Sequence, residues 1–420
     1  MKSFFKNILI KIITLEARAI LKKYHPSIVA VTGSVGKTST KDAIFTVLSP
    51  SCYVRKSEKS FNSDIGVPLT ILGVQNAWND PFHWLQNIFD GLDLIFFKHK
   101  YPECLVLEIG ADHPDDIKKI TEWLKPDISV ITRIGDVPVH IEFFPSLDSL
   151  ISEKAYLVKE LKKDGNLILS ADDKRVRDLS KDVNQKCLTF GIKENATVSA
   201  SNIEIMYSED RRPQGMSFKL NFEGNSVPIK LKGILGIQQI YPVLAATVVG
   251  IARGISFSKI IDSLSNYTST KGRMNIIPGI NDSTIIDDSY NSSPDALHEA
   301  LSTLSYIETS GKRIAILGDM MELGRYSADE HRRAGIHAIE SCKIIITVGL
   351  RAKLMNGNIN FESSNDALEY VKGVVGKRDI ILVKGSQSAR MERIVKVLMS
   401  QSEKASSFLV RQEPEWLAKK

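Results

Sequence analysis

The sequence has few cysteines and lacks long apolar runs. Its 420 residues include four cysteines, which are scattered without the spacing of a zinc site or of a disulfide framework. Such scarcity favours a reducing, cytoplasmic environment. No apolar stretch approaches the roughly 20 residues that span a bilayer. The net charge of +6 is modest, so it gives no argument for nucleic acid as a partner and suits a small polyanion.

The remaining composition is that of a globular protein with more than one core. Apolar residues make up 43% of the chain and charged residues 25%, which is typical of globular domains. A chain of 420 residues is too long for a single hydrophobic core, so its length predicts two or three domains. Its second half contains no G-x-G-x-x-G fingerprint, which disfavours a nicotinamide cofactor.

The strongest chemical signal lies in residues 28–41. The apolar run 28–31 predicts a short buried strand, and residues 38–48 predict a helix. A turn of small residues, 32–36, connects the two. A strand, a glycine-containing turn and a helix start in this order are typical of a phosphate-binding loop. The alternative is an ordinary strand–turn–helix that contains Gly-Lys-Thr by chance.

The groups in this turn suit a nucleotide. Gly33 and Gly36 allow backbone N–H groups to point at phosphates, and the helix N-terminus adds partial positive charge. Lys37 is placed to reach the β- and γ-phosphates, and the Thr38 hydroxyl is placed to bind Mg²⁺. Where the phosphate-loop motif usually has its first glycine, this sequence has Val31, and Gly33 takes over that role.

Strands and helices alternate along the rest of the chain, which predicts an α/β fold with parallel sheets. We expect a P-loop, parallel-sheet central ATPase domain over residues 28–271, with a small antiparallel excursion at 196–232. We expect a C-terminal Rossmann-like α/β domain over 272–400 and a polar, loosely held tail over 401–420. The expected strands are 104–110, 128–134, 166–169, 284–287, 313–317, 344–348 and 379–383, and the expected helices are 147–161, 240–252, 295–307, 328–341, 365–375 and 389–399.

Residues 1–27 precede the first strand, and residues 1–25 predict one basic amphipathic helix. Its apolar positions recur at helical spacing: Phe4, Phe5, Ile8, Ile12, Leu15 and Ala19. The favoured interpretation is a helix that packs on its own domain. The alternative is an interfacial helix that gives the protein a peripheral contact with anionic lipid. The aromatic-rich segment 76–103 is expected to form core or a helix-pair interface, with a membrane-facing patch as the alternative.

Eight motifs in a fixed order resemble those of the Mur ligases, the ATP-dependent amide-forming enzymes of peptidoglycan precursor synthesis. The motifs are Thr32-Gly-Ser-Val-Gly-Lys-Thr-Ser-Thr40, Asn62 with Ile65-Gly-Val-Pro-Leu-Thr70, Leu107-Glu-Ile-Gly110, His140-Ile-Glu142, Gly272-Arg273, Asp287-Asp-Ser-Tyr-Asn-Ser-Ser-Pro294, Leu317-Gly-Asp-Met-Met-Glu-Leu-Gly324 and Lys384-Gly-Ser386. The family member that joins D-alanyl-D-alanine to a UDP-N-acetylmuramoyl tripeptide is the most similar. A usual member carries a UDP-binding domain before the phosphate loop, where this sequence has residues 1–27.

The resemblance implies ATP, two Mg²⁺ sites and a carbamate that CO₂ forms on Lys154. The nucleotide-binding residues implied are Gly33, Ser34, Gly36, Lys37, Thr38, Ser39, Gln239, Arg273, Asp288, Tyr290 and Asn291. The metal ligands implied are Thr38, Glu108, His140 and carbamylated Lys154. The substrate-binding residues implied are Asn62, Asp319 and Lys384, and the catalytic residues are Lys37, Glu108, His140, Lys154 and Arg273.

The reaction implied forms an amide bond in two steps. A substrate carboxylate attacks the γ-phosphorus of ATP, and an amine then attacks the acyl phosphate, leaving ADP and phosphate. Both substrates are small molecules, and we expect a monomer. Two alternatives stay open: a ligase of the polyglutamate or cyanophycin type, and a non-catalytic ATP-binding scaffold.

Overall fold

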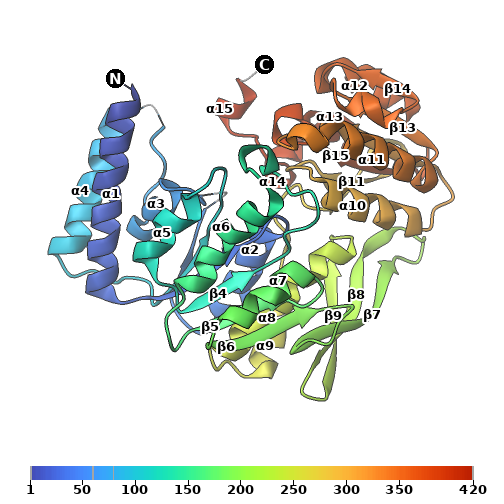
Figure 1. Cartoon of the computed structure of the whole chain (residues 1–420). Helices are drawn as coiled ribbons and strands as arrows, with labels where there is room; N and C mark the ends of the chain where they lie inside the picture. Colours follow the sequence, from blue (N-terminus) through green and yellow to red (C-terminus); the bar gives the residue numbers. More distant parts are fainter. Residues whose placement is uncertain (1, 59–60, 79, 419–420) are drawn as a thin grey trace.

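The structure is a computed structural model that describes residues 2–58, 61–78 and 80–418. These residues form two α/β units, one built on a nine-stranded sheet and one on a six-stranded sheet (Figure 1). In both sheets the central strands run parallel, so their carboxyl ends, where a ligand is expected to bind, lie at the same edge of the sheet. The predicted fold class, a parallel-sheet unit with a phosphate loop followed by a Rossmann-like α/β unit, is confirmed.

The first sheet has the strand order β2-β3-β1-β4-β5-β6-β7-β8-β9. Its strands are β1 Ser27–Thr32, β2 Val54–Lys56, β3 Cys104–Glu108, β4 Ile128–Ile131, β5 Asn166–Ser170, β6 Lys186–Gly191, β7 Val198–Tyr207, β8 Pro213–Phe222 and β9 Asn225–Lys232. The antiparallel excursion predicted from the sequence is β7 to β9, and it extends this sheet because β7 pairs with β6 in parallel. β1 lies between β3 and β4, so the carboxyl ends of all three strands meet at one edge.

Helices cover both faces of this sheet because alternate residues of its strands point to opposite sides. Val29 and Val31 pack with α2 Lys37–Leu48 and α8 Ile240–Ala252. Ile28 and Ala30 belong to the opposite cluster. That cluster includes residues of α1 Lys2–Tyr24, α3 Gly66–Leu72, α5 Asp116–Leu124, α6 Leu147–Lys159 and α7 Lys174–Asp178. The short helix α9 Phe257–Leu264 lies on the side of α2 and α8. The phosphate loop is therefore built on a strand that is buried on both faces.

The second sheet has the order β10-β11-β15-β12-β13-β14, with only β10 antiparallel among the strands described. Its strands are β10 Asn275–Pro278, β11 Thr284–Asp288, β12 Arg313–Gly318, β13 Ile344–Val348, β14 Ile359–Phe361 and β15 Ile380–Lys384. Its helices are α10 Pro294–Tyr306, α11 Ser327–Ser341, α12 Ser364–Val374 and α13 Glu392–Leu398. One apolar cluster contains residues of α8 as well as α10 and α11, so the two units share a packed boundary.

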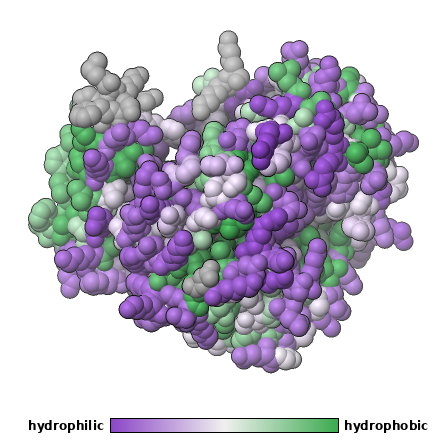
Figure 2. All heavy atoms as spheres, viewed as in Figure 1, coloured by the Kyte–Doolittle hydropathy of each residue, from purple (hydrophilic) through white to green (hydrophobic). Residues whose placement is uncertain are grey.

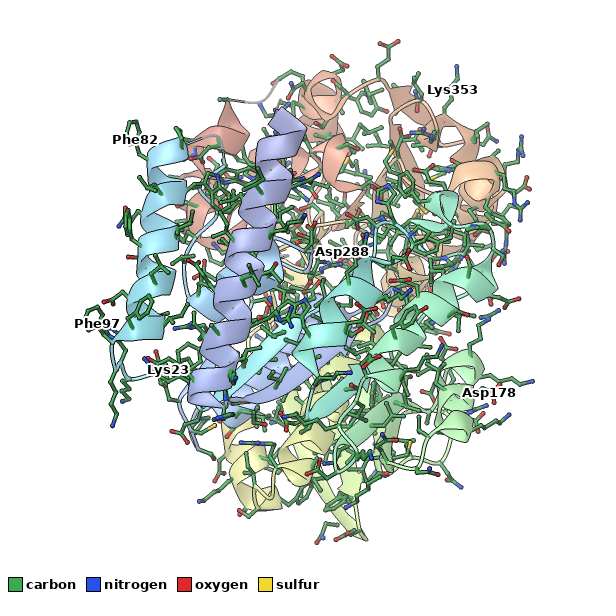
Figure 3. The ribbon with its side chains drawn as sticks, turned by 60° about the vertical axis from the view of Figure 1, so that its left-hand side comes forward. Lys23, Phe82, Phe97, Asp178, Asp288 and Lys353 are labelled. Atoms are coloured by element: carbon green, nitrogen blue, oxygen red, sulfur yellow. The ribbon has the colours of Figure 1, made fainter. Side chains whose placement is uncertain are left out.

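The predicted N-terminal helix is confirmed as α1, but its buried face differs from the expected one. Ile13, Ala17 and Ile20 are fully buried, whereas Ile8 and Leu15, on the expected apolar face, are 40% and 62% exposed. The segment after α3 forms α4 Pro81–Phe96, which lies beside α1 (Figures 1 and 3). The expectation that the aromatics of segment 76–103 form core or a helix interface is wrong for most of them, because α4 buries Asn87 and Gly91 instead. No described helix has both the length and the apolar content needed to cross a membrane.

The C-terminal segment also differs from expectation. It was predicted to be loosely held, yet Ala405 and Leu409 join the apolar cluster of the second unit. The segment contains the short helices α14 Ala405–Phe408 and α15 Pro414–Leu417, and Trp416 of α15 accepts a hydrogen bond from Arg390 through its backbone carbonyl. Leu409 is buried, and the buried guanidinium of Arg411 lies 3.2 Å from Glu392 and donates to the backbone carbonyls of Ser289 and Tyr290. An ion pair at the start of α13 and two capped carbonyls therefore hold a segment whose sequence is polar.

A buried carboxyl group in the α1–α4 interface predicts how stability depends on pH. Glu16 is 5% exposed, neither of its oxygens has a hydrogen-bond partner among the described residues, and burial raises its pKa from 4.5 to about 7. Between these values the unfolded chain loses this proton while the folded chain keeps it, so the free energy of unfolding falls as pH rises through this window. We expect Glu16→Gln to raise that free energy by about 2 kcal/mol at about pH 8, and by much less at about pH 5.

Urea unfolding of both proteins at the two pH values measures this difference. The matched control is Glu122→Gln, an exposed glutamate on α5, which should change stability little at either pH. An equal gain from Glu16→Gln at both pH values would contradict the assignment.

Candidate active site

The phosphate loop is seated on the end of the neighbouring strand β4. The backbone N–H groups of Ser34 and Val35 donate to the carbonyl of Arg133 at 2.7 and 3.2 Å. Gly33 has φ of 145°, and a Cβ there would lie 1.9 Å from the Thr132 hydroxyl oxygen. That hydroxyl is fixed in turn, because it donates to the carbonyls of Thr32 and Val35. Glycine is therefore required where β1 turns into the loop.

Two lysines meet at one carbonyl beneath this loop. Lys37 Nζ donates to the Gly33 carbonyl at 3.0 Å, and Lys154 Nζ, from α6, donates to the same oxygen at 3.1 Å. Burial, with Lys37 close by, lowers the pKa of Lys154 to about 7, and burial lowers the pKa of Lys37. Because Gly36 is the N-cap residue of α2, the partial positive charge of the helix start adds to the field of these lysines. The arrangement suits a polyanion such as a nucleotide triphosphate.

A carboxylate and a hydroxyl lie beside the loop with oxygen atoms to offer. Glu108 ends β3 next to β1, is 1% exposed, and accepts a hydrogen bond from Asn62 Nδ2 at 3.2 Å. Its second oxygen, Oε2, has no partner among the described residues. Thr38 at the start of α2 lines the same cleft. Such hard oxygens are the ligands that Mg²⁺ prefers, so these residues fit the metal that the sequence predicts.

The cleft holds no metal centre made by protein side chains alone. Within the described ranges, no group of three or more His, Cys, Asp or Glu side chains is arranged to hold an ion. Mg²⁺ usually takes one or two carboxylates and completes its shell with phosphate and water oxygens. The single buried carboxylate Glu108 beside the phosphate loop is consistent with that pattern.

His140 bridges the two units across the cleft. Its Nδ1 lies 2.8 Å from Glu322 of the second unit, and its Nε2 lies 3.5 Å from Asp112. The imidazole lowers the pKa of the Glu322 carboxyl through their hydrogen bond. The resemblance to the Mur ligases assigned His140 to a metal. The sequence did not single out either carboxylate, because both lie in loops and meet His140 only in the fold.

The cleft between the two units has a volume of about 680 Å³. From the second unit, Arg273 stacks over Tyr290 at 4.2 Å from its ring centre, and Asn291 lies beside them. Of the predicted site residues, those lining the cleft are Ser34, Gly36, Lys37, Thr38, Asn62, Glu108, His140, Arg273, Tyr290 and Asn291. The lining also includes residues to which the sequence assigned no role, among them Asp112, Glu322, Ser386, Gln387, Ser388, Arg390 and Trp416.

Seven predicted residues lie outside this lining: Gly33, Ser39, Lys154, Gln239, Asp288, Asp319 and Lys384. Lys384 and Asp288 form a buried ion pair of 2.6 Å because they face each other at the ends of β15 and β11. Lys384 also donates to the Asn291 carbonyl at 3.0 Å, so the pair supports the cleft wall from behind. The Asp319 carboxylate accepts from the Ala352 N–H at 2.6 Å, and Gln239 is buried next to α8.

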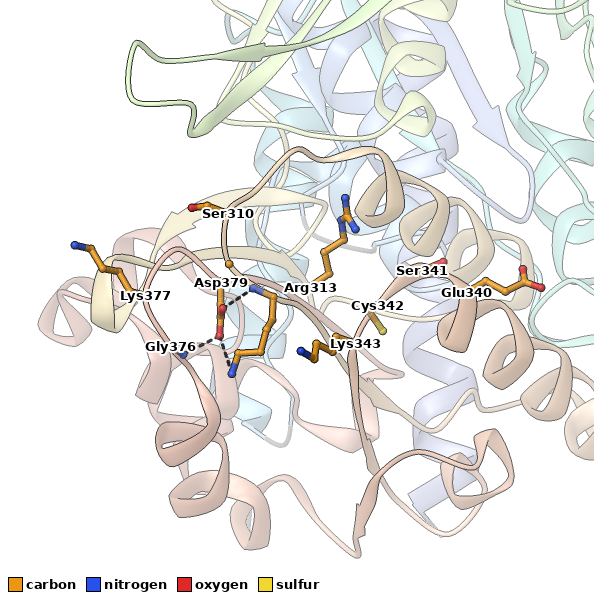
Figure 4. Close-up of a pocket in the computed structure, with 11 residues that line it drawn as sticks. Ser310, Arg313, Glu340, Ser341, Cys342, Lys343, Gly376, Lys377 and Asp379 are labelled. Carbon is orange, nitrogen blue, oxygen red and sulfur yellow. Dashed lines mark hydrogen bonds and ion pairs between the residues drawn. The ribbon is translucent and has the colours of Figure 1, made fainter.

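A second hollow lies at the amino-terminal edge of the six-stranded sheet (Figure 4). It is basic, but Asp379 accepts from the Lys312 backbone N–H at 2.7 Å, and its carboxylate lies 3.6 Å from Lys312 Nζ. The side chains of Lys377 and Arg313 point in different directions in Figure 4. Since the cations do not converge on one point, we assign no ligand to this hollow.

Comparisons with known proteins agree with this geometry. Residues 31–250 match the profile described as Mur ligase middle domain, and residues 272–387 match the profile described as Mur ligase, glutamate ligase domain. The UDP-N-acetylmuramoyl-tripeptide–D-alanyl-D-alanine ligase of Buchnera aphidicola (subspecies Baizongia pistaciae) is 30% identical over 91% of this chain and 77% of its own length. That of Bacillus subtilis is 29% identical over 91% and 78%. The crystal structure of the MurF ligase from Thermotoga maritima in complex with ADP has a TM-score of 0.77, is 25% identical, and matches over 94% of this chain and 84% of its own.

The close approach of Gly33 to Thr132 at the start of the phosphate loop gives a direct prediction. Gly33→Ala adds a methyl group against the fixed Thr132 hydroxyl at a strained φ, so we expect the loop to shift and nucleotide affinity to fall at least about tenfold. Titration of a fluorescent ATP analogue measures this change. The matched control is Gly224→Ala in the β8–β9 turn, where φ is 79° but no atom lies within 4 Å of the new carbon. Full nucleotide affinity in Gly33→Ala would show that the close approach of Gly33 to Thr132 does not shape the phosphate loop.

Proposed function

Because the chain belongs to the Mur ligase family, and is therefore an ATP-dependent, ADP-forming carboxylate–amine ligase, we propose that it joins D-alanyl-D-alanine to a peptidoglycan-precursor carboxylate. The relatives named above are ligases of this specificity, which supports the choice of amine and carrier. The observation that carries the proposal is the cleft, where Lys37, Thr38 and Glu108 of one unit face Arg273 and Tyr290 of the other.

The reaction that we propose begins with attack of the substrate carboxylate on the γ-phosphorus of ATP, which releases ADP and forms an acyl phosphate. The Gly36 turn, the α2 N-terminus and Lys37 hold the phosphates and attract their negative charge. Mg²⁺ bound by Thr38 and Glu108 would neutralise charge on the phosphates. The amine then attacks the acyl phosphate, forming the amide and releasing phosphate. Closure of the two units would keep water away from this hydrolysis-prone species.

We also propose roles for the second unit. Arg273, stacked on Tyr290, offers a cation to the nucleotide, and Asn291 offers an amide. Lys384 and Asp288 act on the nucleotide through Asn291, whose carbonyl Lys384 holds. His140 keeps the second-metal role that the sequence predicts for it together with carbamylated Lys154, and its contacts with Asp112 and Glu322 hold its ring at the boundary of the two units. Gln239, Ser39, Asn62 and Asp319 keep the nucleotide-binding and substrate-binding roles that the sequence predicts. A monomer acting in the cytoplasm also remains a prediction.

A screen of substrate pairs tests the proposal. Phosphate release is measured for each pair of an acid and an amine. The acids are UDP-N-acetylmuramoyl tripeptide, the same muramoyl tripeptide without UDP, and glutamate chains. The amines are D-alanyl-D-alanine and single amino acids. We expect turnover with D-alanyl-D-alanine and the muramoyl acids, and mass spectrometry should show the new amide. Turnover with glutamate chains alone would favour the polyglutamate alternative, and nucleotide binding without turnover on any pair would favour the scaffold.

The same assay tests Lys37. We expect Lys37→Ala to lower kcat at least about a hundredfold, because the charge that develops on the transferred phosphoryl group loses its nearest cation. The matched control is Lys119→Ala, a solvent-facing lysine on α5, which should keep full activity. A Lys37→Ala enzyme with wild-type kcat would remove the phosphate loop from the mechanism.

We further propose that Lys154 carries a carbamate. The amine is 4% exposed at the base of the phosphate loop, and no described carboxylate lies within ion-pair distance of it. A carbamate, formed when the neutral amine takes up CO₂ and loses a proton, would supply hard anionic oxygens of the kind that Mg²⁺ prefers. Such a change would also remove the repulsion between Lys154 and Lys37.

Chemical rescue tests the carbamate. We expect Lys154→Ala to lose most of its activity. Acetate or propionate, by filling the space of the carbamate, should then raise the activity of this variant about tenfold. Lys159→Ala, which changes an exposed lysine at the end of the same helix α6, is the control and should neither lose activity nor respond to acetate. A folded Lys154→Ala enzyme with unchanged activity, or one that no short carboxylate restores, would contradict the carbamate.

A further inference from the structure

The outer face of α4 is apolar and open to solvent. Phe82, Leu85, Phe89 and Phe96 are 83%, 51%, 60% and 74% exposed. Their spacing of three, four and seven residues places them on one side of the helix. Figure 3 shows the side chains of Phe82 and Phe97 pointing outward at opposite ends of α4. The helix therefore turns a stripe of large apolar side chains away from the protein.

The residues flanking α4 extend this stripe. Trp78 before the helix is 71% exposed, and Phe97 after it is 65% exposed. We call these six residues the α4 ridge: Trp78, Phe82, Leu85, Phe89, Phe96 and Phe97. Apolar surface gathers over α1 and α4 in the space-filling view (Figure 2). Exposed apolar residues that cluster in this way mark a contact surface, whereas isolated ones do not.

The contacts that hold α4 come from the side opposite the ridge. On its inner side, Gly91 approaches Glu16 of α1 so closely that a Cβ would lie 2.5 Å from the carboxylate. Asn87 donates to the Gln75 carbonyl at 2.8 Å. At the C-terminal end, Lys23 Nζ donates to the carbonyls of Leu94, Ile95 and Phe97 at 2.5 to 3.0 Å, and Tyr24 Oη donates to two of them. The helix is thus fixed from one side, and the ridge remains available on the other.

Basic side chains flank the ridge. Lys98 and Lys100 are exposed directly after it. On the adjacent helix α1 the exposed stripe is aliphatic and basic: Ile8, Lys11, Leu15, Arg18 and Lys22.

Three acidic residues also lie on or next to α4. Asp80 caps its N-terminus, Asp93 lies 2.8 Å from His99, and Asp90 is exposed. The exposed cations that follow α4 and lie on α1 outnumber these carboxylates, so this side of the molecule carries a net positive charge.

An aromatic stripe with flanking lysines and arginine has the chemistry of a helix that lies in a membrane interface. Apolar side chains of such a helix enter the boundary between headgroups and acyl chains, and basic residues attract anionic lipid. α4 has 16 residues, which corresponds to about 24 Å of length lying parallel to the surface. We propose that the α4 ridge docks the protein on the surface of a bilayer that contains anionic lipid.

The position of the ridge leaves the cleft free. In Figure 1 the α1–α4 pair lies at one side of the molecule, and the six-stranded sheet lies at the other. None of the six ridge residues lines the cleft. Docking is therefore independent of ligation of dissolved substrates, and the two proposals can fail separately.

Vesicle co-sedimentation tests the docking. The probe is unilamellar vesicles of about 70% phosphatidylcholine and about 30% phosphatidylglycerol, with pure phosphatidylcholine vesicles for comparison. We expect wild type to pellet with the anionic vesicles, less with neutral ones, and less at high salt. The triple variant Phe82→Gln, Phe89→Gln, Phe96→Gln should lower the partition coefficient at least about tenfold. The matched control replaces three exposed apolar residues of the second unit: Tyr306→Gln, Ile336→Gln and Leu350→Gln.

A second pair of variants keeps the test decisive if the phenylalanine triple variant does not fold. Lys98→Glu with Lys100→Glu should weaken binding to anionic vesicles and leave binding to neutral ones unchanged, whereas Lys219→Glu with Lys230→Glu, on β8 and β9, should change neither. Phosphate release with dissolved substrates confirms that each variant is folded. Wild type that does not pellet, or a folded triple variant that pellets equally, overturns the proposal. A dimer in analytical ultracentrifugation that the triple variant abolishes, without vesicle binding, assigns the ridge to a second copy and also overturns it.

Discussion

The meeting of two lysine amines at the Gly33 carbonyl is the constraint on which the active cleft depends. Lys37 comes from the start of α2 and Lys154 from α6, so one oxygen gathers amines from both faces of the sheet. Two cations this close would repel each other, and burial lowers the pKa of both amines, so the pair is a poor holder of two positive charges. Phosphates bound in the loop would offset the charge of Lys37, and the carbamate proposed on Lys154 would replace the second positive charge with a negative one.

The position of that carbonyl is fixed by the sheet. β1 is buried on both faces and lies between β3 and β4, and the loop after it bonds to the Arg133 carbonyl at the end of β4. The same strand order brings Glu108, at the end of β3, to the side of the loop. The second unit is held against this edge by Arg133, whose guanidinium pairs with Glu299 of α10. Residue 133 thus supports the loop through its backbone and the second unit through its side chain.

The sequence predicted correctly those features that depend mainly on residues close together in the chain. The strand, turn and helix at 28–48 and the alternation that gives two parallel sheets followed from motif and periodicity. Of the ten predicted residues that line the cleft, those of the phosphate loop followed from its motif, whereas His140, Arg273, Tyr290 and Asn291 came from the resemblance to the Mur ligases. The failures share a cause, which is that burial is decided by partners distant in sequence. Arg411 is polar, yet Glu392 and two carbonyls of the loop after β11 bury it. Trp416 reaches the cleft for the same reason. Asp288 and Lys384 look like free site residues until the register of β11 and β15 pairs them.

The helix α4 shows the limit of hydrophobicity as a signal. Its many phenylalanines predicted a core element, but the side that packs contains Asn87 and Gly91, because Glu16 and Leu72 leave space only for a small residue there. Polar contacts from Lys23 and Tyr24 then fix its end. A helix positioned by small and polar groups does not need its aromatic residues for folding. Their exposure is therefore a property of the surface that α4 presents, and the explanation for it lies in what that surface contacts.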